Sequence, residues 1–307
     1  MKNNVAMIVG MIGVSFVIVV GGFVYRNSIK TILVKPDEIT TISKIEQTTA
    51  TASAQIEQTA TQSSAIIPSP TPGIVLPPIA PNERSVRVPI LLYHYISDNP
   101  NKDDKARDGL STPPSIFKSQ LDTLKSAGYT TVTFDELAAF FDGTSSLPSK
   151  PVILTFDDGY SDFYFNAYPI LAGAGMKGVA FISTGLIGGG AYMTWSQVEE
   201  IARSPFVVVA AHSMHHYVLT KSNTAILKNE LEESKKILQQ HAPYPINWMA
   251  YPYGSFDERV VLAVRDAGYV GAATTMPGTY QYKSRLFHMP RLRAGRRTGE
   301  GLLRLIE

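Results

Sequence analysis

The chain has 307 residues and no cysteine, which excludes a disulfide framework and any thiolate metal site. Its net charge of +2 is too close to neutral for a general nucleic-acid binder, so we expect no nucleic-acid partner. Aromatic side chains are missing from residues 27–91, and residues 41–80 carry only three charged residues. These gaps separate a polar segment from a folded domain.

The segment at residues 26–84 is predicted to be a disordered linker. Of the 40 residues from 41 to 80, 27 are Ser, Thr, Ala, Gln or Pro. Such a composition cannot bury enough apolar surface to offset the entropy of ordering the chain. As a coil, about 60 residues span roughly 45 Å, and the proline-rich end at 68–81 should be stiffer.

One long hydrophobic run, Val5–Tyr25, has no charged residue, and a helix of this length is about 31 Å long, enough to cross a bilayer. A cleaved signal peptide is the alternative, but Arg26 follows directly and no small-residue cleavage pattern is present. We therefore predict a short tail at 1–4 and a membrane anchor at 5–25. The flanking charges, Lys2 against Arg26, Lys30 and Lys35, favour a cytoplasmic C-terminal part, which conflicts with the function inferred below.

Residues 85–307 are predicted to be one α/β domain in which strands alternate with helices. Apolar and β-branched runs predict strands at 88–93, 152–156, 178–182, 206–211, 248–251 and 269–274. Helices are predicted at 115–127, 162–172, 224–240 and near 256–267, and a Thr194–Gln197 capping box opens another. Repeated β-α units indicate a parallel sheet, either open or closed into a barrel.

Two neighbouring carboxylates, Asp157 and Asp158, end the strand at 152–156. The turn begun by Gly159 allows both side chains to enter one pocket, although adjacent residues of a strand point in opposite directions. Two ionised carboxylates in one pocket need a cation or a shared proton. The alternative is an Asp-Gly turn in which one Asp caps the following helix.

His212, His215 and His216 follow the apolar strand at 206–211 and are half of the six histidines. In α/β folds, ligand chemistry lies at the carboxyl ends of the strands. His212 and His216 together with Asp158 supply three N and O ligands and leave a position for water, a pattern typical of a catalytic zinc-type site. Such a set accepts a divalent metal, Zn first and also Co, Ni or Fe. A satisfied surface cluster is the alternative.

The sequence TFDDG at 155–159, followed by H-S-x-x-H at 212–216, resembles the first two motifs of the polysaccharide deacetylases. These form the NodB-homology group of carbohydrate esterases, family four, and the resemblance covers nearly the whole folded domain. It implies a distorted (β/α) barrel in which Asp157 is the general base. It also implies that Asp158, His212 and His216 bind the metal, with His215 as a bystander or supporting group.

The family that the chain resembles has a third motif, Arg-x-Pro-Tyr. This motif is altered here because Ala250 occupies the arginine position. The family uses the backbone N–H after the proline as an oxyanion donor, which implies that Tyr253 has this role. Arg291 or Arg293 is predicted to replace the missing arginine that orients Asp157. A solvated basic tail is the alternative for these two arginines.

The family's late Leu-x-His motif is not evident, and the first strand instead ends in Tyr93-His94-Tyr95-Ile96. This resembles the permuted branch, the poly-β-1,6-N-acetylglucosamine deacetylases, and implies that protonated His94 is the general acid. His288 is the reserve, and a core histidine is the alternative for His94. Trp195 is a candidate for stacking on a sugar ring, although a core tryptophan is the simpler interpretation.

Together the residues and the resemblance predict a metal-dependent hydrolase that removes N-acetyl groups from an N-acetylglucosamine polysaccharide of the cell wall or of an exopolysaccharide. We expect a monomer anchored in the cell membrane by a single span, with its catalytic domain outside the cell. The alternatives are an O-acetyl esterase acting on acetylated glycans and a catalytically impaired carbohydrate-binding protein, the latter suggested by Ala250. Peptidoglycan, poly-N-acetylglucosamine and chitin-like chains are not distinguished.

Overall fold

The computed structural model describes residues 76–307, so the predicted tail, anchor and most of the linker lie outside the described residues. Within 76–307, no helix is long and apolar enough to cross a membrane. The ordered contacts begin before residue 85. The Pro77 carbonyl accepts a hydrogen bond from Arg285 at 2.9 Å, and Glu83 accepts one from the Ser284 hydroxyl at 2.8 Å. The end of the predicted linker is therefore packed against the domain.

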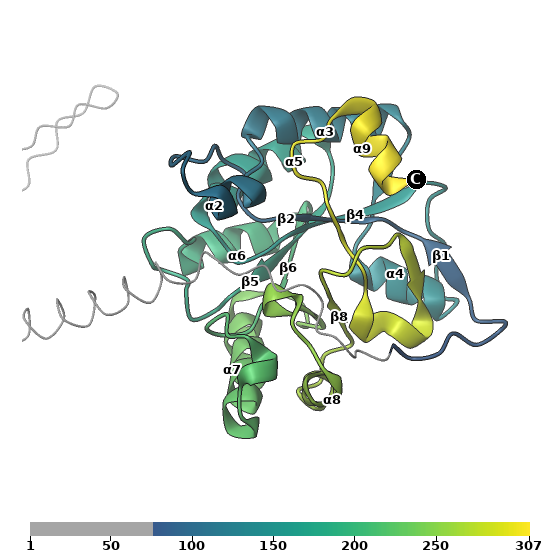
Figure 1. Ribbon diagram of the computed structural model, residues 1–307, viewed down its shortest axis with the longest axis vertical. Coiled ribbons are helices and arrows are strands. Elements are labelled where there is room, and N and C mark those ends of the chain that lie inside the picture. The colour runs from purple at the N-terminus through teal and green to yellow at the C-terminus, as the bar shows by residue number, and fades with distance from the viewer. Residues whose placement is uncertain (1–75) are drawn as a thin grey trace, which may run out of the picture. The chain divides into compact units, whose positions relative to one another are not determined.

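An open sheet of eight parallel strands forms the centre of the described region (Figure 1). Its order is β10-β2-β4-β5-β6-β7-β8, with β3 beside β4. The strands are β2 Ile90–Tyr93, β3 Thr130–Thr131, β4 Pro151–Phe156, β5 Gly178–Ile182, β6 Val207–Ala211, β7 Trp248–Ala250, β8 Gly271–Ala273 and β10 Leu292–Arg293. The predicted parallel α/β alternation is confirmed.

The predicted distorted barrel is a half-barrel. The hydrogen-bonded path of the sheet ends at β8 on one side and at β10 on the other. Only a single parallel bridge, from Ala273 of β8 to Met289, continues beyond β8 toward the segment that leads into β10. The two-residue β10 is too short to close the sheet into a continuous barrel.

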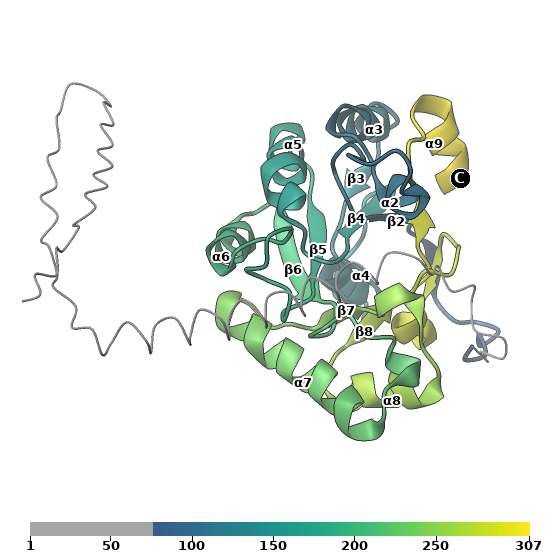
Figure 2. The same cartoon turned by 60° about the vertical axis from the view of Figure 1, so that its left-hand side comes forward.

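Helices surround the sheet, as Figure 2 shows. They are α2 Lys105–Leu110, α3 Pro114–Ser126, α4 Phe134–Phe141, α5 Tyr168–Ala174, α6 Trp195–Arg203, α7 Thr224–His241, α8 Glu258–Asp266 and α9 Gly299–Ile306. A small antiparallel pair, β1 Ser85–Arg87 with β9 Tyr280–Tyr282, and the 3-10 segment η4 Lys283–His288 complete the domain. The helix predicted at 162–172 is confirmed, and its first part is the π-helical turn η1 Phe163–Ala167, which runs into α5.

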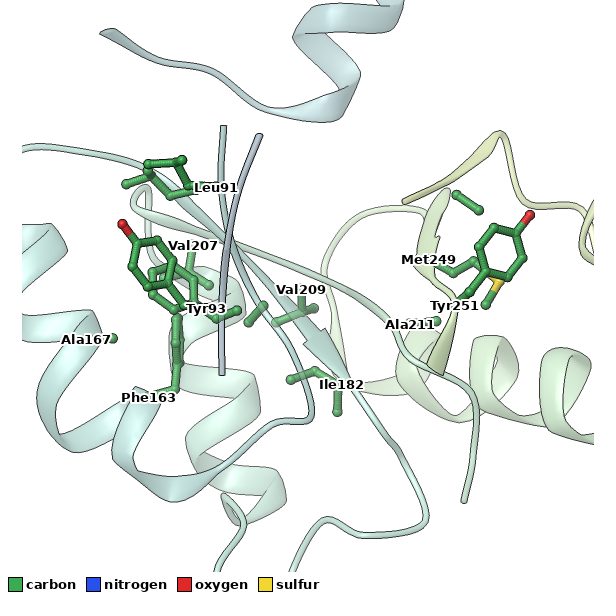
Figure 3. Packing of buried hydrophobic residues seen from close by; sticks show 14 of the residues in the cluster. Leu91, Tyr93, Phe163, Ala167, Ile182, Val207, Val209, Ala211, Met249 and Tyr251 are labelled. Carbon is green, nitrogen blue, oxygen red and sulfur yellow. The ribbon is translucent and has the colours of Figure 1, made fainter. Parts of the chain in front are cut away.

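Both faces of the sheet are buried, which explains why its strands are apolar throughout rather than alternating. Leu91 and Val209 belong to the larger hydrophobic cluster, part of which Figure 3 shows, where the sheet packs against helices such as α3 and α7. Ile90 and Ile153 point the other way and pack against Phe134 of α4. The polar side chains that follow these segments in the sequence are therefore found where the strands end.

The capping box predicted for α6 is confirmed: the Gln197 N–H donates to the Thr194 hydroxyl at 3.3 Å, and the Thr194 N–H donates to the Gln197 side chain at 2.8 Å. The same box, formed by Thr133 and Glu136, opens α4, a helix that the sequence analysis did not predict. Helix α4 covers the inner face of the half-barrel, so this unpredicted element completes the second cluster.

His288 in η4 makes the stability of the fold depend on pH. Its side chain is 6% exposed, its ring lies 5.4 Å from that of Phe256, and its Nδ1 atom has no hydrogen-bond partner among residues 76–307. Burial, assisted by the charges of Arg265 and Arg285, lowers the pKa of His288 to about 4. The folded state therefore keeps this imidazole neutral at a pH where the unfolded chain, with a pKa of about 6.5, binds a proton.

We expect the free energy of unfolding to fall as the pH decreases from about 6.5 toward 4, because there the unfolded state binds more protons than the folded state. Urea unfolding of the wild type and of His288→Leu at pH 7 and pH 5 tests this expectation. The variant should lose less stability than the wild type between the two pH values, because the other titrating groups are present in both proteins. An equal loss in both proteins would contradict the assignment to His288.

Candidate active site

The predicted site residues meet because the strands are parallel and end at the same edge of the half-barrel. His94 follows β2, the two aspartates follow β4, and His212 follows β6. The carboxyl ends of parallel strands share one edge, so residues far apart in the sequence become neighbours there. Asp158, His212 and His216 form a group whose possible metal-binding atoms all lie within 4.8 Å of one another.

Asp158 is the centre of this group. Its Oδ1 atom lies 3.3 Å from Nε2 of His212 and 3.1 Å from Nε2 of His216. On the far side of the His212 ring, Nδ1 is 2.8 Å from the carbonyl oxygen of Ala250. A carbonyl can only accept, so Nδ1 carries the hydrogen, and in the neutral ring the lone pair of Nε2 faces Asp158.

The group fits a divalent metal ion on the chemistry of its donors. Asp158 Oδ1 is buried and has no hydrogen-bond partner in the described part of the chain. An acceptor that faces an imidazole lone pair at short range needs a cation or a proton between them. One carboxylate and two imidazoles suit Zn, Co, Ni or Fe without naming one of them.

The charges of the group are mutually dependent. Burial raises the pKa of the Asp158 carboxyl, but the imidazoles of His216 and His212 outweigh burial and hold the pKa well below its usual range. Burial lowers the pKa of His212, but the charges of Asp157 and Asp158 raise it further than burial lowers it. Both carboxylates thus favour the cationic form of the His212 imidazole, as they would favour a bound cation.

Several backbone angles at this edge are unusual. Asp158 has a φ of 80°, Ser213 of 60°, His216 of 59° and Tyr253 of 59°. Left-handed conformations cost a residue with a side chain about 1–3 kcal/mol and persist only where the surrounding structure imposes them. Two of these four residues, Asp158 and His216, belong to the candidate metal group. The unusual backbone conformation therefore sets the direction of these two side chains.

Asp157 forms a bidentate ion pair with Arg291, and its Oδ2 atom also lies 3.9 Å from Nε2 of His212. The guanidinium donates to both carboxylate oxygens at 2.7 Å, and the two side chains belong to residues that are 2% and 4% exposed. Arg291 also donates to the Thr274 carbonyl at 2.8 Å and to the Thr155 hydroxyl at 3.1 Å, which fixes its plane. Burial raises the pKa of Asp157, but the Arg291 charge outweighs burial and the net pKa is lowered.

The structure thus selects Arg291, rather than Arg293, as the partner of Asp157. The position of the missing motif arginine, Ala250, is fully buried in β7, and its carbonyl accepts the hydrogen bond from His212. The replacement guanidinium comes from the segment just before β10, beside β2. The alternative interpretation, a solvated basic tail, is therefore wrong for Arg291, which is buried.

Of the two candidate acid histidines, only His94 is brought to the aspartates. Burial lowers the pKa of His94 to about 4, and the charges of Asp158 and Asp157 partly oppose that shift. The charges that act on His288 are instead those of Arg265 and Arg285. His94 therefore lies in the field of both carboxylates and is neutral near pH 7 in the metal-free site.

Tyr253 and Trp195 occupy different surroundings. The Tyr253 ring lies 4.5 Å from the ring of His216, which places this residue beside the metal group. The Trp195 indole stacks on His241 at 4.0 Å and packs against the core. Packing accounts for Trp195, and its contact with a sugar stays a prediction.

Glu230 of α7 was missed by the sequence analysis. Its carboxylate is 1% exposed and accepts hydrogen bonds from the backbone N–H groups of Met214 and His215 at 3.0 and 2.8 Å. It also binds the His215 ring through Nδ1 at 2.6 Å. His215, predicted to be a bystander or supporting group, thus ties the loop that carries His216. The signal was a glutamate on the apolar stripe of the helix, beside Leu227 and Leu231.

A half-barrel with an Asp-His-His group and a second, arginine-paired aspartate at its carboxyl edge has the arrangement of a glycan deacetylase. The sequence model of the polysaccharide deacetylase family matches residues 144–272. Bacillus subtilis YxkH, named for the same activity class, is 29% identical over 211 residues, which are 69% of this chain and 72% of that protein. The domain matched at residues 144–272 thus belongs to the polysaccharide deacetylase family, hydrolases that act on N-acetyl groups.

Solved structures agree with this membership. The Streptococcus pyogenes deacetylase PplD, in complex with acetate, has a TM-score of 0.68 and 28% identity and covers 73% of this chain and 100% of that chain. A Bacillus cereus polysaccharide deacetylase has a TM-score of 0.65 and 26% identity, covering 73% and 70%. The Escherichia coli poly-β-1,6-N-acetyl-D-glucosamine N-deacetylase is 32% identical over 145 residues, but these cover only 22% of that protein.

Replacing Glu230 by Ala should loosen the loop that carries His216. We expect roughly 10- to 100-fold weaker binding of Zn²⁺, because groups that hold metal ligands in place contribute on that scale. The free energy of unfolding should fall by about 1–3 kcal/mol, since buried N–H donors lose their acceptor. Competition with a chromophoric chelator and urea unfolding measure the two effects.

Glu232→Ala is the matched control, since Glu232 lies on the same helix and forms an ion pair with Lys228 at the surface, at 3.7 Å. It should leave both quantities nearly unchanged. If Glu230→Ala bound Zn²⁺ as tightly as Glu232→Ala, Glu230 would have no part in positioning the ligands.

Proposed function

We propose that this protein removes N-acetyl groups from N-acetylglucosamine residues of a polysaccharide, using a divalent metal, with Zn²⁺ the first candidate. The observation that carries the proposal is the separation of the two buried carboxylates, Asp157 bound to Arg291 and Asp158 facing two imidazoles. The substrate class is supported by the relatives named poly-β-1,6-N-acetyl-D-glucosamine N-deacetylases from Escherichia coli and Staphylococcus aureus.

Asp158, His212 and His216 would hold the metal. A bound divalent ion lowers the pKa of water toward 7 and polarises a carbonyl oxygen. The His212 ring needs no rearrangement for this role, because the Ala250 carbonyl already fixes which nitrogen carries the hydrogen.

Asp157 is the proposed general base. Both of its oxygens accept from Arg291, so the carboxylate is fixed in orientation and its pKa is lowered. A base of low pKa accepts a proton efficiently only from a strongly acidified water, as expected of general acid–base catalysis. The buried ion pair therefore ties the activity of Asp157 to occupancy of the neighbouring site.

His94 is the proposed proton donor to the leaving amine, which departs poorly unless it is protonated. The pKa of about 4 revises the expectation that His94 is protonated before the reaction begins. The imidazole is neutral at rest and must gain its proton during turnover, after Asp157 has taken one from water. The charges of both carboxylates favour that gain, since they raise the pKa of His94 against burial.

Tyr253 is proposed to stabilise the oxyanion through its backbone N–H, an interaction worth about 3–4 kcal/mol per donor in comparable sites. Its left-handed φ of 59° turns the backbone next to the ring of His216. The Arg291–Asp157 pair also removes the reason for considering a catalytically impaired binding protein, which was the missing arginine at Ala250.

We further propose that residues 5–25 anchor the protein in the cell membrane and residues 26–76 tether the domain outside the cell, since residues 77–84 contact the domain. The chain enters the domain through β1 and then β2, at the amino ends of the parallel strands. The candidate site lies at the carboxyl ends. The candidate site and the point where the described chain enters the sheet thus lie at opposite ends of the parallel strands.

Acetate release tests the proposed function directly. The metal-loaded chain should release acetate from poly-β-1,6-N-acetylglucosamine, peptidoglycan or chitin oligosaccharides, and a chelator should stop the release. Asp157→Asn should keep Zn²⁺ and lose about 100-fold or more of the rate, because the proton acceptor is missing. Asp158→Ala should lose Zn²⁺ itself, since one of three ligands is removed.

Acetylated xylan is the comparison substrate for the alternative O-acetyl esterase. Acetate release from xylan, with none from any N-acetylated glycan, would refute the N-deacetylase proposal and support the O-acetyl esterase instead. A fully active Asp157→Asn would refute the assignment of the base.

A further inference from the structure

Beside the metal group, three tyrosines stack in a row that the proposed mechanism does not use. The rings of Tyr95 and Tyr160 lie 3.9 Å apart with 26° between their planes, and those of Tyr160 and Tyr192 lie 5.0 Å apart with 20°. Tyr95 follows β2, Tyr160 follows β4, and Tyr192 precedes α6. Three separate segments thus place nearly parallel aromatic faces together.

The Tyr95 end of the row is closed by a cation. The Arg107 guanidinium lies 3.2 Å from the centre of the Tyr95 ring. Arg107 also donates to the Ser97 hydroxyl at 3.2 Å, and Ser97 in turn donates to Asp162 at 2.6 Å. The Tyr95 end is therefore held by these polar contacts. Tyr192 is the ring at the other end of the row.

The Tyr192 end is fixed by backbone pairing. Tyr160 and Tyr192 form an antiparallel bridge, the Ser161 N–H donates to the Ala191 carbonyl at 2.9 Å, and the Met193 N–H donates to the Gly159 carbonyl at 3.0 Å. Residues 188–191 of this loop are exposed, and Tyr192 is partly buried. The paired backbone therefore fixes the position of Tyr192, a partly exposed residue at the edge of an exposed loop.

The row lies close to the proposed chemistry. Tyr160 is two residues after Asp158, and Tyr95 directly follows His94. Burial raises the pKa of the Tyr192 hydroxyl, and the Asp158 charge raises it further, with Tyr253 also contributing. The terminal ring of the row thus lies near both the metal group and the proposed oxyanion donor.

We propose that the Tyr192 ring is a stacking surface for a pyranose ring of the glycan, the one next to the sugar whose acetamide is hydrolysed. The inference rests on the proposed function and adds a specificity-determining residue to it. An aromatic face suits the apolar C–H face of a pyranose, and a ring already held by stacking loses little entropy on binding. Tyr192 is a positioning residue, since the reacting atoms belong to the neighbouring sugar.

The test compares a flat aromatic side chain at position 192 with an apolar side chain that has no flat face. In the Zn²⁺-loaded full chain carrying Asp157→Asn, titration calorimetry with N-acetylglucosamine oligosaccharides measures binding without turnover. Tyr192→Phe keeps a flat face and should retain the parent affinity. Tyr192→Leu keeps apolar packing against Tyr160 but has no flat face, and should bind roughly 3- to 10-fold more weakly. In the otherwise wild-type chain, Tyr192→Leu should raise KM and leave kcat nearly unchanged.

Tyr280→Leu is the matched control, because Tyr280 is 53% exposed on β9, in the ribbon with β1 that precedes the amino end of β2. It should bind the oligosaccharides like the parent. Thermal melting and Zn²⁺ content confirm that each variant is folded and loaded. Equal affinity of Tyr192→Leu and the parent would overturn the proposal, as would Tyr192→Phe binding as weakly as Tyr192→Leu.

The outcome is separable from the proposed function. A wild-type chain that releases acetate, together with unaltered binding by Tyr192→Leu, would remove the stacking surface alone. A wild-type chain that releases no acetate from any N-acetylated glycan would remove the proposed function. If the Asp157→Asn parent also bound none of the oligosaccharides, the stacking surface would fall as well.

Discussion

Two carboxylates on consecutive residues are buried at the end of one strand, and each stays ionised because positive groups face it, with the His212 imidazole close to both. Asp157 is neutralised by the guanidinium of Arg291, with both oxygens bonded at 2.7 Å, while Asp158 depends on the imidazoles of His212 and His216. Removing one partner of a buried pair costs about 3–5 kcal/mol, because the remaining charge is left uncompensated. The same separation divides the proposed chemistry into a fixed base and a ligand set.

The half-barrel imposes this separation through its geometry. Its strands are apolar on both faces, so charged groups occur only where the strands end, and the parallel order brings four strand ends to one edge. At that edge, Asp158 has a left-handed φ of 80°, and its carboxylate lies beside His212 and His216. Glu230 then fixes the loop that carries His216. The fold and the site are therefore stabilised by the same contacts.

Local signals predicted much of this arrangement. The strand predicted at 178–182 is β5 with the same bounds, and the motifs around Asp158 and His212 identified a group that the fold does bring together. The choice between Arg291 and Arg293 was not predictable, because Arg291 meets Asp157 across 134 residues, and the two-residue strand that follows it, β10, is too short to show an alternating pattern. Glu230 was missed because a polar residue on the apolar face of a helix does not indicate which groups it will bind in the folded structure. The stacked tyrosines depend on three loops whose meeting only the tertiary structure determines.

The most direct test of the division between the two aspartates is a crystal structure of the Zn²⁺-loaded chain with anomalous scattering recorded at the zinc edge. The account predicts one ion bound by Asp158 Oδ1 and by Nε2 of His212 and His216 at about 2.0–2.2 Å, with Asp157 still bonded to Arg291 through both oxygens. An ion that takes Asp157 as a ligand and displaces Arg291, or an ion bound away from these histidines, would contradict it.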